Sequence, residues 1–131
     1  MRDRKMFRAM EPDEDGSPKV GSEANMLGVR PLIDMKNKSS LAGPGLGGLS
    51  VFVDDRSRML NALLPKEFGG PHALNALFVA PESILAPANL VLSEPNAKSH
   101  AVIEASRECS LDDFQQQLHS TRAMWRREEP K

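Results

Sequence analysis

Short apolar runs separated by polar breaks recur along most of this 131-residue chain. Runs of four to six residues bounded by Pro, Gly, Asp or Asn are typical of strands. Residues 27–31 are also expected to be extended, because the residue before a proline is disfavoured in the helical region. A helix is expected over 56–64, where Met59, Leu60, Leu63 and Leu64 share one face. The pattern predicts strands over residues 5–10, 49–53, 77–80, 89–92 and 100–105.

The C-terminal segment carries the strongest helical pattern. Ser110 is a suitable N-cap, and acidic residues at 112 and 113 suit the positive end of a helix. Apolar or small residues then recur at helical spacing and form one stripe, at Leu111, Phe114, Leu118, Thr121 and Trp125. This pattern predicts a helix from Leu111 to about Arg127 that docks on a sheet.

The expected fold class is therefore α+β, in one domain spanning 1–131. Residues 12–25 and 128–131 are expected to be loop or flexible, since the first of these is acidic and rich in turn residues. The expected core is Phe7, Val29, Val51, Phe52, Leu60, Leu77, Val79, Leu90, Val102, Ile103, Phe114, Leu118 and Trp125.

Composition narrows the classes of function. The net charge of −1 gives no basic field that would indicate nucleic-acid binding. The single Cys109 cannot form an internal disulfide, so a reducing compartment is expected. No apolar run follows the charged N-terminus, and none approaches the ~20 residues of a membrane span. These features predict a cytoplasmic protein, or one delivered to a target cell by a route that needs no signal peptide, without a membrane partner.

A glycine-rich turn spans residues 43–48 and leads into the strand that begins at Leu49. It matches G-x-G-x-x-G, but a dinucleotide fingerprint requires a preceding strand and a following helix, and here a strand follows. One interpretation is a flexible turn that lets two elements meet, which the residue types favour. The other is that bare backbone at Gly47 and Gly48 approaches a ligand, with Ser50 presented just beyond.

Four polar residues lie in or beside the predicted strands. Arg8 and Arg30 sit in apolar runs, where each must point to solvent, pair with a carboxylate or bind an anion such as a diphosphate. Glu104 follows His100 by four residues, which places both on one face of their strand. That carboxylate could act as a base, hold a ribose hydroxyl or face water. No histidine pair has metal-ligand spacing, so no metal site is expected.

Several segments, taken in order, resemble one family of small proteins. They are Met6–Met10, Leu27–Pro31 with Asp34, the stretch Pro44–Val51, the loop Pro65–Gly70, the strand His100–Ala105 and the segment Leu111–Trp125. The chain is similar to the ADP-ribosyltransferase-like toxins delivered by bacterial type VI secretion, and to related uncharacterised bacterial and fungal proteins.

This resemblance implies a small split β-sheet, mixed or antiparallel, with a C-terminal helix and a cleft that takes NAD as substrate. It assigns Arg8 to the dinucleotide phosphates, Ser50 to the nicotinamide ribose, and His100 or Glu104 to activation. The activity implied is ADP-ribosyl transfer or NAD glycohydrolysis by a toxin, whose partners would be a protein target and an immunity protein.

The chain also departs from the family pattern. Leu46 stands where the family usually carries Thr, and Ala105 where it often carries Pro. Residues 77–92 do not align with the pattern. A fold relative without catalysis, acting as a protein-binding module, is therefore the alternative.

Overall fold

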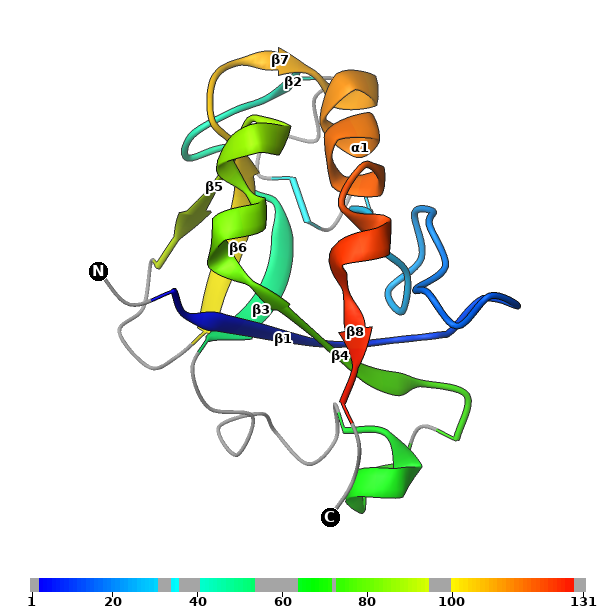
Figure 1. The fold of residues 1–131 in the computed structure, drawn as a ribbon. Helices are drawn as coiled ribbons and strands as arrows, with labels where there is room; N and C mark the ends of the chain where they lie inside the picture. The colour runs from blue at the N-terminus through cyan, green and yellow to red at the C-terminus, as the bar shows by residue number, and fades with distance from the viewer. Residues whose placement is uncertain are drawn as a thin grey trace.

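A computed structural model describes most of the chain. The described residues are 3–30, 34–35, 41–53, 64–71, 73–94 and 100–128. The expected helix over 56–64, apart from Leu64, and the expected core residue Leu60 lie outside them. The protein is α+β, with a mostly antiparallel sheet and a helix near the C-terminus (Figure 1).

Six strands form the main sheet, in the order β5-β6-β3-β1-β4-β8. Every strand pair in this order is antiparallel. The five strands expected from the sequence are present, each within one residue of its expected bounds at both ends. The strands are β1 (Lys5–Met10), β3 (Leu49–Val53), β4 (Ala76–Pro81), β5 (Leu90–Ser93), β6 (His100–Ala105) and β8 (Arg126–Arg127).

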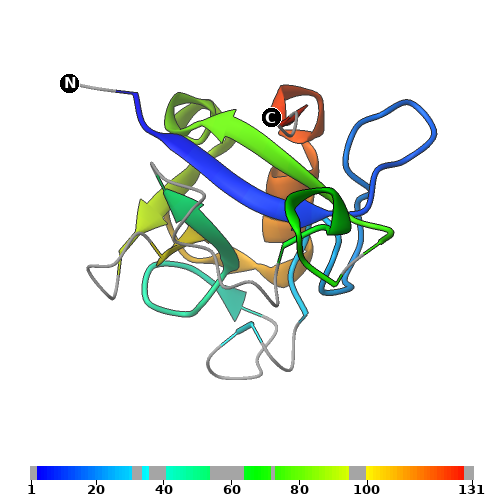
Figure 2. The same cartoon turned by 90° about the horizontal axis from the view of Figure 1, so that it is seen from below.

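The sheet is split between β1 and β3. Among the described residues these strands are in register at just two places, Met6 with Val53 and Phe7 with Phe52, whereas β1 pairs with β4 along its full length. Beyond the two shared positions β1 and β3 diverge, and Figure 1 shows them crossing at a steep angle. The sheet therefore consists of one half with β1, β4 and β8 and another with β3, β6 and β5, as Figure 2 shows from below.

Short elements close the top of the molecule. β2 (Leu41–Ala42) pairs with β7 (Cys109–Ser110) just before α1 (Leu111–His119) begins. The Ser110 side chain accepts a hydrogen bond from the Asp113 N–H at 3.1 Å, which confirms the expected N-cap. The 3₁₀ turns are η3 (Lys66–Phe68), η4 (Glu82–Ile84), η5 (Ala86–Ala88) and η6 (Arg122–Met124).

The main core lies between the inner faces of the two sheet halves and α1. Met6 and Phe78 from one half, and Val51 and Ile103 from the other, pack in the same buried cluster as Phe114. A smaller cluster on the opposite face is built on Phe7 and Leu77. Of the expected core residues that are described, only Phe52, Val79 and Val102 are not fully buried. Phe52 and Val79 pack against this second cluster, whereas Val102 is opposite the exposed Ser50.

The expected helix to Arg127 is too long. α1 ends at His119, and the chain continues through η6 into β8. The Thr121 hydroxyl donates to the Leu118 carbonyl at 2.7 Å and accepts from the Trp125 indole N–H at 3.1 Å. A side chain that bonds the last turn competes with helical continuation. Trp125 is still buried, so the apolar stripe serves the core although the helix stops early.

Candidate functional site

Arg8 spans the split in the sheet. It lies on β1, and its guanidinium donates to the Ser50 carbonyl of β3 at 2.8 Å. It also donates to the carbonyls of Ala24 at 2.9 Å and Met26 at 3.1 Å. The Nε atom is buried and has no hydrogen-bond partner. Arg8 therefore connects β1 to β3 and to the segment of residues 24–26 through the main chain, and it bonds no carboxylate among the described residues.

The charge of Arg8 is retained despite its burial. Burial lowers the pKa of Arg8 to about 10, nearby Asp34 raises it and nearby Arg30 lowers it. The side chain is therefore cationic at neutral pH. A buried cation without a bonded carboxylate is costly, and it favours the arrival of an anion.

Arg30 is the second cation of this region, and it is paired. Its side chain donates to the Asp34 carboxylate at 3.1 and 3.3 Å, and its own N–H donates to the same carboxylate at 2.7 Å. These bonds raise the pKa of Arg30. The two arginines and one aspartate together leave one net positive charge, which comes from Arg8.

Ser50 and Glu104 share the face of the second sheet half that points away from the main core. Ser50 is opposite Val102 in the register of β3 with β6, so Glu104 is its diagonal neighbour. Diagonal neighbours in an antiparallel pair lie about 7–8 Å apart. Ser50 is exposed, but Glu104 is only 7% exposed, which excludes the expectation that its carboxylate simply faces water.

The glycine turn covers Glu104. Both oxygens of this carboxylate accept from the Gly45 N–H, each at 3.3 Å, which is long for such a bond. The turn is closed by a hydrogen bond from the Leu46 N–H to the Gly43 carbonyl at 3.0 Å. Gly45 and Gly47 have φ values of 81° and 97°, which favour glycine.

Gly48 is needed for a different reason. A Cβ added there would overlap the carbonyl of Ile103, so the turn can approach β6 only with a bare backbone. The expectation that this motif lets two elements meet is consistent with this geometry. The same approach brings the turn onto Glu104. At Gly48 the close neighbour is the Ile103 carbonyl, and the approach of a ligand to this backbone stays a prediction.

The structure thus brings some of the candidate residues together. Arg8 touches the main chain of Ser50, Arg30 lies near Arg8, and Glu104 is adjacent to Ser50 on the same face. Arg8 and Glu104 do not hydrogen-bond each other. His100 begins β6, but the position of its side chain lies outside what the structure describes.

Sequence reasoning missed the acceptors of Arg8. Two of the three acceptors are the main-chain carbonyls of Ala24 and Met26, and no side chain in that segment indicates that they bond an arginine. The only local signal was the presence of an arginine in an apolar run, which must find partners somewhere.

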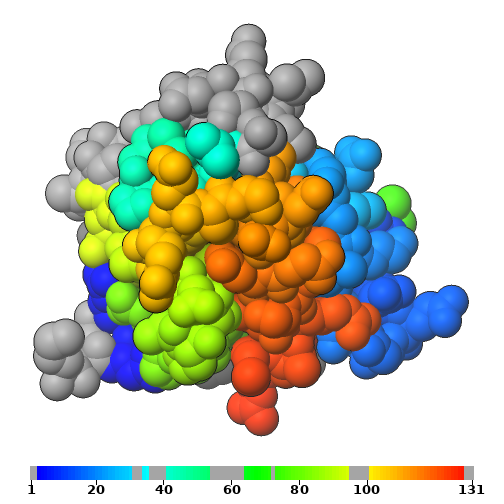
Figure 3. Space-filling model, turned by 90° about the horizontal axis from the view of Figure 1, so that it is seen from above, coloured from blue at the N-terminus to red at the C-terminus, as the bar shows by residue number. Residues whose placement is uncertain are grey.

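A separate hollow lies between η5 and the end of α1. Figure 3 shows these two segments side by side. The volume of the hollow is about 170 Å³, below the roughly 300–1,000 Å³ usual for pockets that hold small-molecule ligands. None of its lining residues belongs to the Arg8–Glu104 region. It is lined by Ile84, Pro87, Ala88, Ser120, Thr121 and Met124.

The described residues contain neither a candidate metal site nor a membrane-spanning helix. Within them, no group of three His, Cys, Asp or Glu side chains could hold a metal ion. No helix in the same part of the chain is long and apolar enough to cross a membrane.

Comparison of the chain with protein-family models, with curated proteins and with solved structures found no match. Evidence about the function of the chain therefore comes from the chemistry of its residues and from the resemblance of its sequence motifs.

Proposed function

We propose that this protein is an ADP-ribosyltransferase-like enzyme that binds NAD at the split in its sheet and acts as a toxin on an intracellular target. The observation that carries the proposal is the half-buried, cationic Arg8, which crosses the split to the Ser50 carbonyl and bonds no carboxylate among the described residues. An anionic diphosphate is a suitable partner for such a group. NAD glycohydrolysis, in which water replaces the protein acceptor, would use the same site.

Glu104 has the properties that the reaction needs. A carboxylate offers about four acceptor positions, and within the described residues Glu104 accepts from one shared N–H, that of Gly45. The remaining capacity is available for a ribose hydroxyl or for an attacking group. Cleavage of the glycosidic bond in NAD produces an oxocarbenium-like sugar, which a neighbouring carboxylate stabilises and orients.

The roles follow from these positions. Arg8, with Arg30 nearby, attracts the diphosphate. Ser50, exposed on the face that it shares with Glu104, is within reach of the nicotinamide ribose, and Glu104 activates. Gly47 and Gly48 allow the turn to approach this region closely. His100 stays a candidate on sequence grounds.

The test is NAD turnover by the purified chain, read as release of nicotinamide. E104Q is expected to lower turnover about 100-fold, because it removes the charge that stabilises the transition state. E108Q is the matched control, since Glu108 is exposed and four residues further along the chain. S50A, compared with S106A, tests the ribose contact in the same assay.

Two outcomes would contradict the enzyme. One is a folded wild-type chain that neither binds nor cleaves NAD. The other is equal turnover by E104Q and E108Q.

A non-catalytic protein-binding module is the second candidate. It is favoured by the fact that both Arg8 and Glu104 already bond the main chain, as structural groups do. Expression in a growing cell separates the two functions. Growth arrest by the wild type that E104Q relieves supports the enzyme, whereas arrest by both proteins supports binding to a partner. Normal growth of cells that express the wild type at a high level would contradict the proposal that the protein is a toxin.

A further inference from the structure

Gln115 bonds both polar groups of the main chain at Val29. The Val29 N–H donates to the Gln115 Oε1 at 3.0 Å, and the Gln115 Nε2 donates back to the Val29 carbonyl at 2.8 Å. Val29 is fully buried and belongs to no strand. Buried main-chain groups require partners, and a carboxamide supplies one donor and one acceptor in the geometry of a peptide group. The side chain therefore takes the place that a neighbouring strand would occupy.

The surrounding residues are shaped to this contact. The Gln115 Nε2 also donates to the Ser22 hydroxyl at 3.3 Å. A Cβ at Gly28 would overlap the Gly21 carbonyl and lie 2.9 Å from the Gln115 Oε1. Glycine at 28 thus gives room for both the loop crossing and the carboxamide. Figure 3 shows the light-blue segment of the twenties lying against the orange helix.

The segment that Gln115 holds is the one that completes the Arg8 site. Three and five residues before Val29 are Met26 and Ala24, whose carbonyls accept from the Arg8 guanidinium. One residue after Val29 is Arg30, whose charge influences the pKa of Arg8. The bidentate contact from α1 therefore holds the Val29 end of a short stretch that carries two acceptors of Arg8 and the second cation. The other end is held by main-chain bonds, from the Glu11 N–H to the Asn25 carbonyl and from the Leu27 N–H to the Lys19 carbonyl, each at 2.8 Å.

We infer that Gln115 is a positioning residue for the Arg8 site: it holds residues 28–30 in place, and through the segment that they end it sets the orientation of the Arg8 guanidinium toward an anionic ligand. Its consequence for catalysis rests on the proposed function, but the orientation of Arg8 is a property of the protein alone.

The variants Q115A and Q115E test this role. Alanine removes both hydrogen bonds. Glutamate keeps the acceptor for the Val29 N–H, but it loses the donor and puts a negative charge beside the Val29 carbonyl. Gln116 is exposed on the same helix, so Q116A and Q116E are matched controls of equal size and charge.

The first measurement needs no ligand. Hydrogen exchange at the Val29 amide is expected to become about tenfold faster in Q115A, which corresponds to the loss of one hydrogen bond. The NMR signal of the Arg8 Nε–H is expected to move in Q115A and Q115E and to keep its place in the Gln116 controls. An unmoved Arg8 signal, with faster exchange at Val29, would overturn the positioning role and leave Gln115 a structural residue only.

The second measurement separates this inference from the proposed function. If the wild type cleaves NAD, Q115A is expected to raise KM about tenfold while kcat changes less than twofold, because misplaced cations weaken binding of the diphosphate in ground and transition state alike. A fall in kcat with unchanged KM would contradict the role. If the wild type does not take NAD, the proposed function fails, and the Arg8 signal alone decides the place of Gln115.

Discussion

Arg8 and Glu104 are charged groups on different halves of the sheet, and they are held in opposite ways. Arg8 makes three hydrogen bonds of 2.8–3.1 Å to main-chain carbonyls that lie 16 to 42 residues away from it in sequence. Glu104 shares one N–H from a turn of glycines, at 3.3 Å to each oxygen. The first group is thus part of the framework, whereas the second keeps most of its hydrogen-bonding capacity.

This difference predicts that mutation of Arg8 affects stability and mutation of Glu104 affects activity. Removing a buried donor leaves its former acceptors unsatisfied, which costs stability. Removing a weakly held carboxylate costs little stability and abolishes whatever chemistry it performs. Arg8 is therefore expected to matter for folding and binding together, and Glu104 mainly for activity. Mutations at Arg8 and in the glycine turn that covers Glu104 test this difference.

The largest effect is expected for R8M. Methionine keeps much of the apolar stem but leaves the carbonyls of Ser50, Ala24 and Met26 without this donor. The free energy of unfolding in urea should fall by about 2–3 kcal/mol, since hydrogen bonds from a charged group contribute roughly 1.5–3 kcal/mol each, but water can reach these acceptors, which belong to exposed or half-buried residues.

R4M is the matched control for this experiment. Arg4 lies four residues earlier and bonds the carboxylates of Glu82 and Glu94 at 2.8 Å near the surface. Ion pairs of this kind contribute about 1 kcal/mol or less. If R8M cost no more than R4M, the carbonyl contacts of Arg8 would not be structural.

For the glycine turn that covers Glu104, the sharper test compares the stability of G48A with that of G45A. Alanine at 48 would place its Cβ on the Ile103 carbonyl, so β3 and β6 must separate locally. Forcing such an overlap is expected to cost about 1–3 kcal/mol. It should also displace the turn from Glu104, so NAD turnover is expected to fall with stability.

G45A meets no neighbour within 4 Å, but it puts a side chain at a φ of 81°. The expected loss for this left-handed position is about 1 kcal/mol. Urea unfolding of both variants gives the comparison. Equal losses would show that the close approach of Gly48 to β6 is not what constrains the turn.

The strands were predictable because each is a short apolar run with its own turn residues. The run at Lys5–Met10 and the run at His100–Ala105 carry that signal locally. The order of the strands is not local, since β1 contacts partners more than forty residues away. The end of α1 was mispredicted because a 3₁₀ turn after it keeps Trp125 on the same stripe.

The candidate site was predictable in part for a similar reason. An arginine in a strand has to find partners, and that requirement identified Arg8. The burial of Glu104 could not be foreseen, because its cover comes from a turn some sixty residues earlier. Gln115 carried no signal either, since a polar residue in an amphipathic helix ordinarily faces water.

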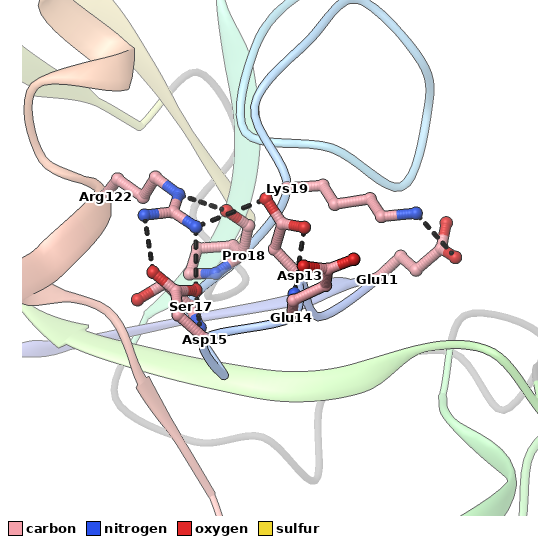
Figure 4. A network of polar contacts seen from close by, with 8 residues as sticks. All are labelled: Glu11, Asp13, Glu14, Asp15, Ser17, Pro18, Lys19 and Arg122. Atoms are coloured by element: carbon pink, nitrogen blue, oxygen red, sulfur yellow. Dashed lines mark hydrogen bonds and ion pairs between the residues drawn. The ribbon is translucent and has the colours of Figure 1, made fainter.

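The smallest effect is expected at Arg122, which fastens the acidic turn after β1 to the end of α1 (Figure 4). It donates to both oxygens of Asp15 at 2.7 and 2.9 Å, and to the Pro18 carbonyl at 3.1 Å. This contact, together with the Ser17 N–H, lowers the pKa of Asp15. Unlike Arg8, Arg122 is neutralised by carboxylates at the surface.

The pH dependence follows from the direction of that shift. A carboxyl whose pKa is lower in the folded state stabilises the protein above its unfolded pKa, and this stabilisation is lost as the pH falls through the folded value. R122A should therefore be less stable than the exposed control R126A at neutral pH. The gap should shrink below about pH 4, where aspartate begins to protonate. Urea unfolding from pH 7 to pH 3 measures this difference in stability between the two variants. A difference that stays constant with pH would mean that Arg122 acts through its bond to the Pro18 carbonyl and not through Asp15, just as Arg8 acts through bonds to main-chain carbonyls.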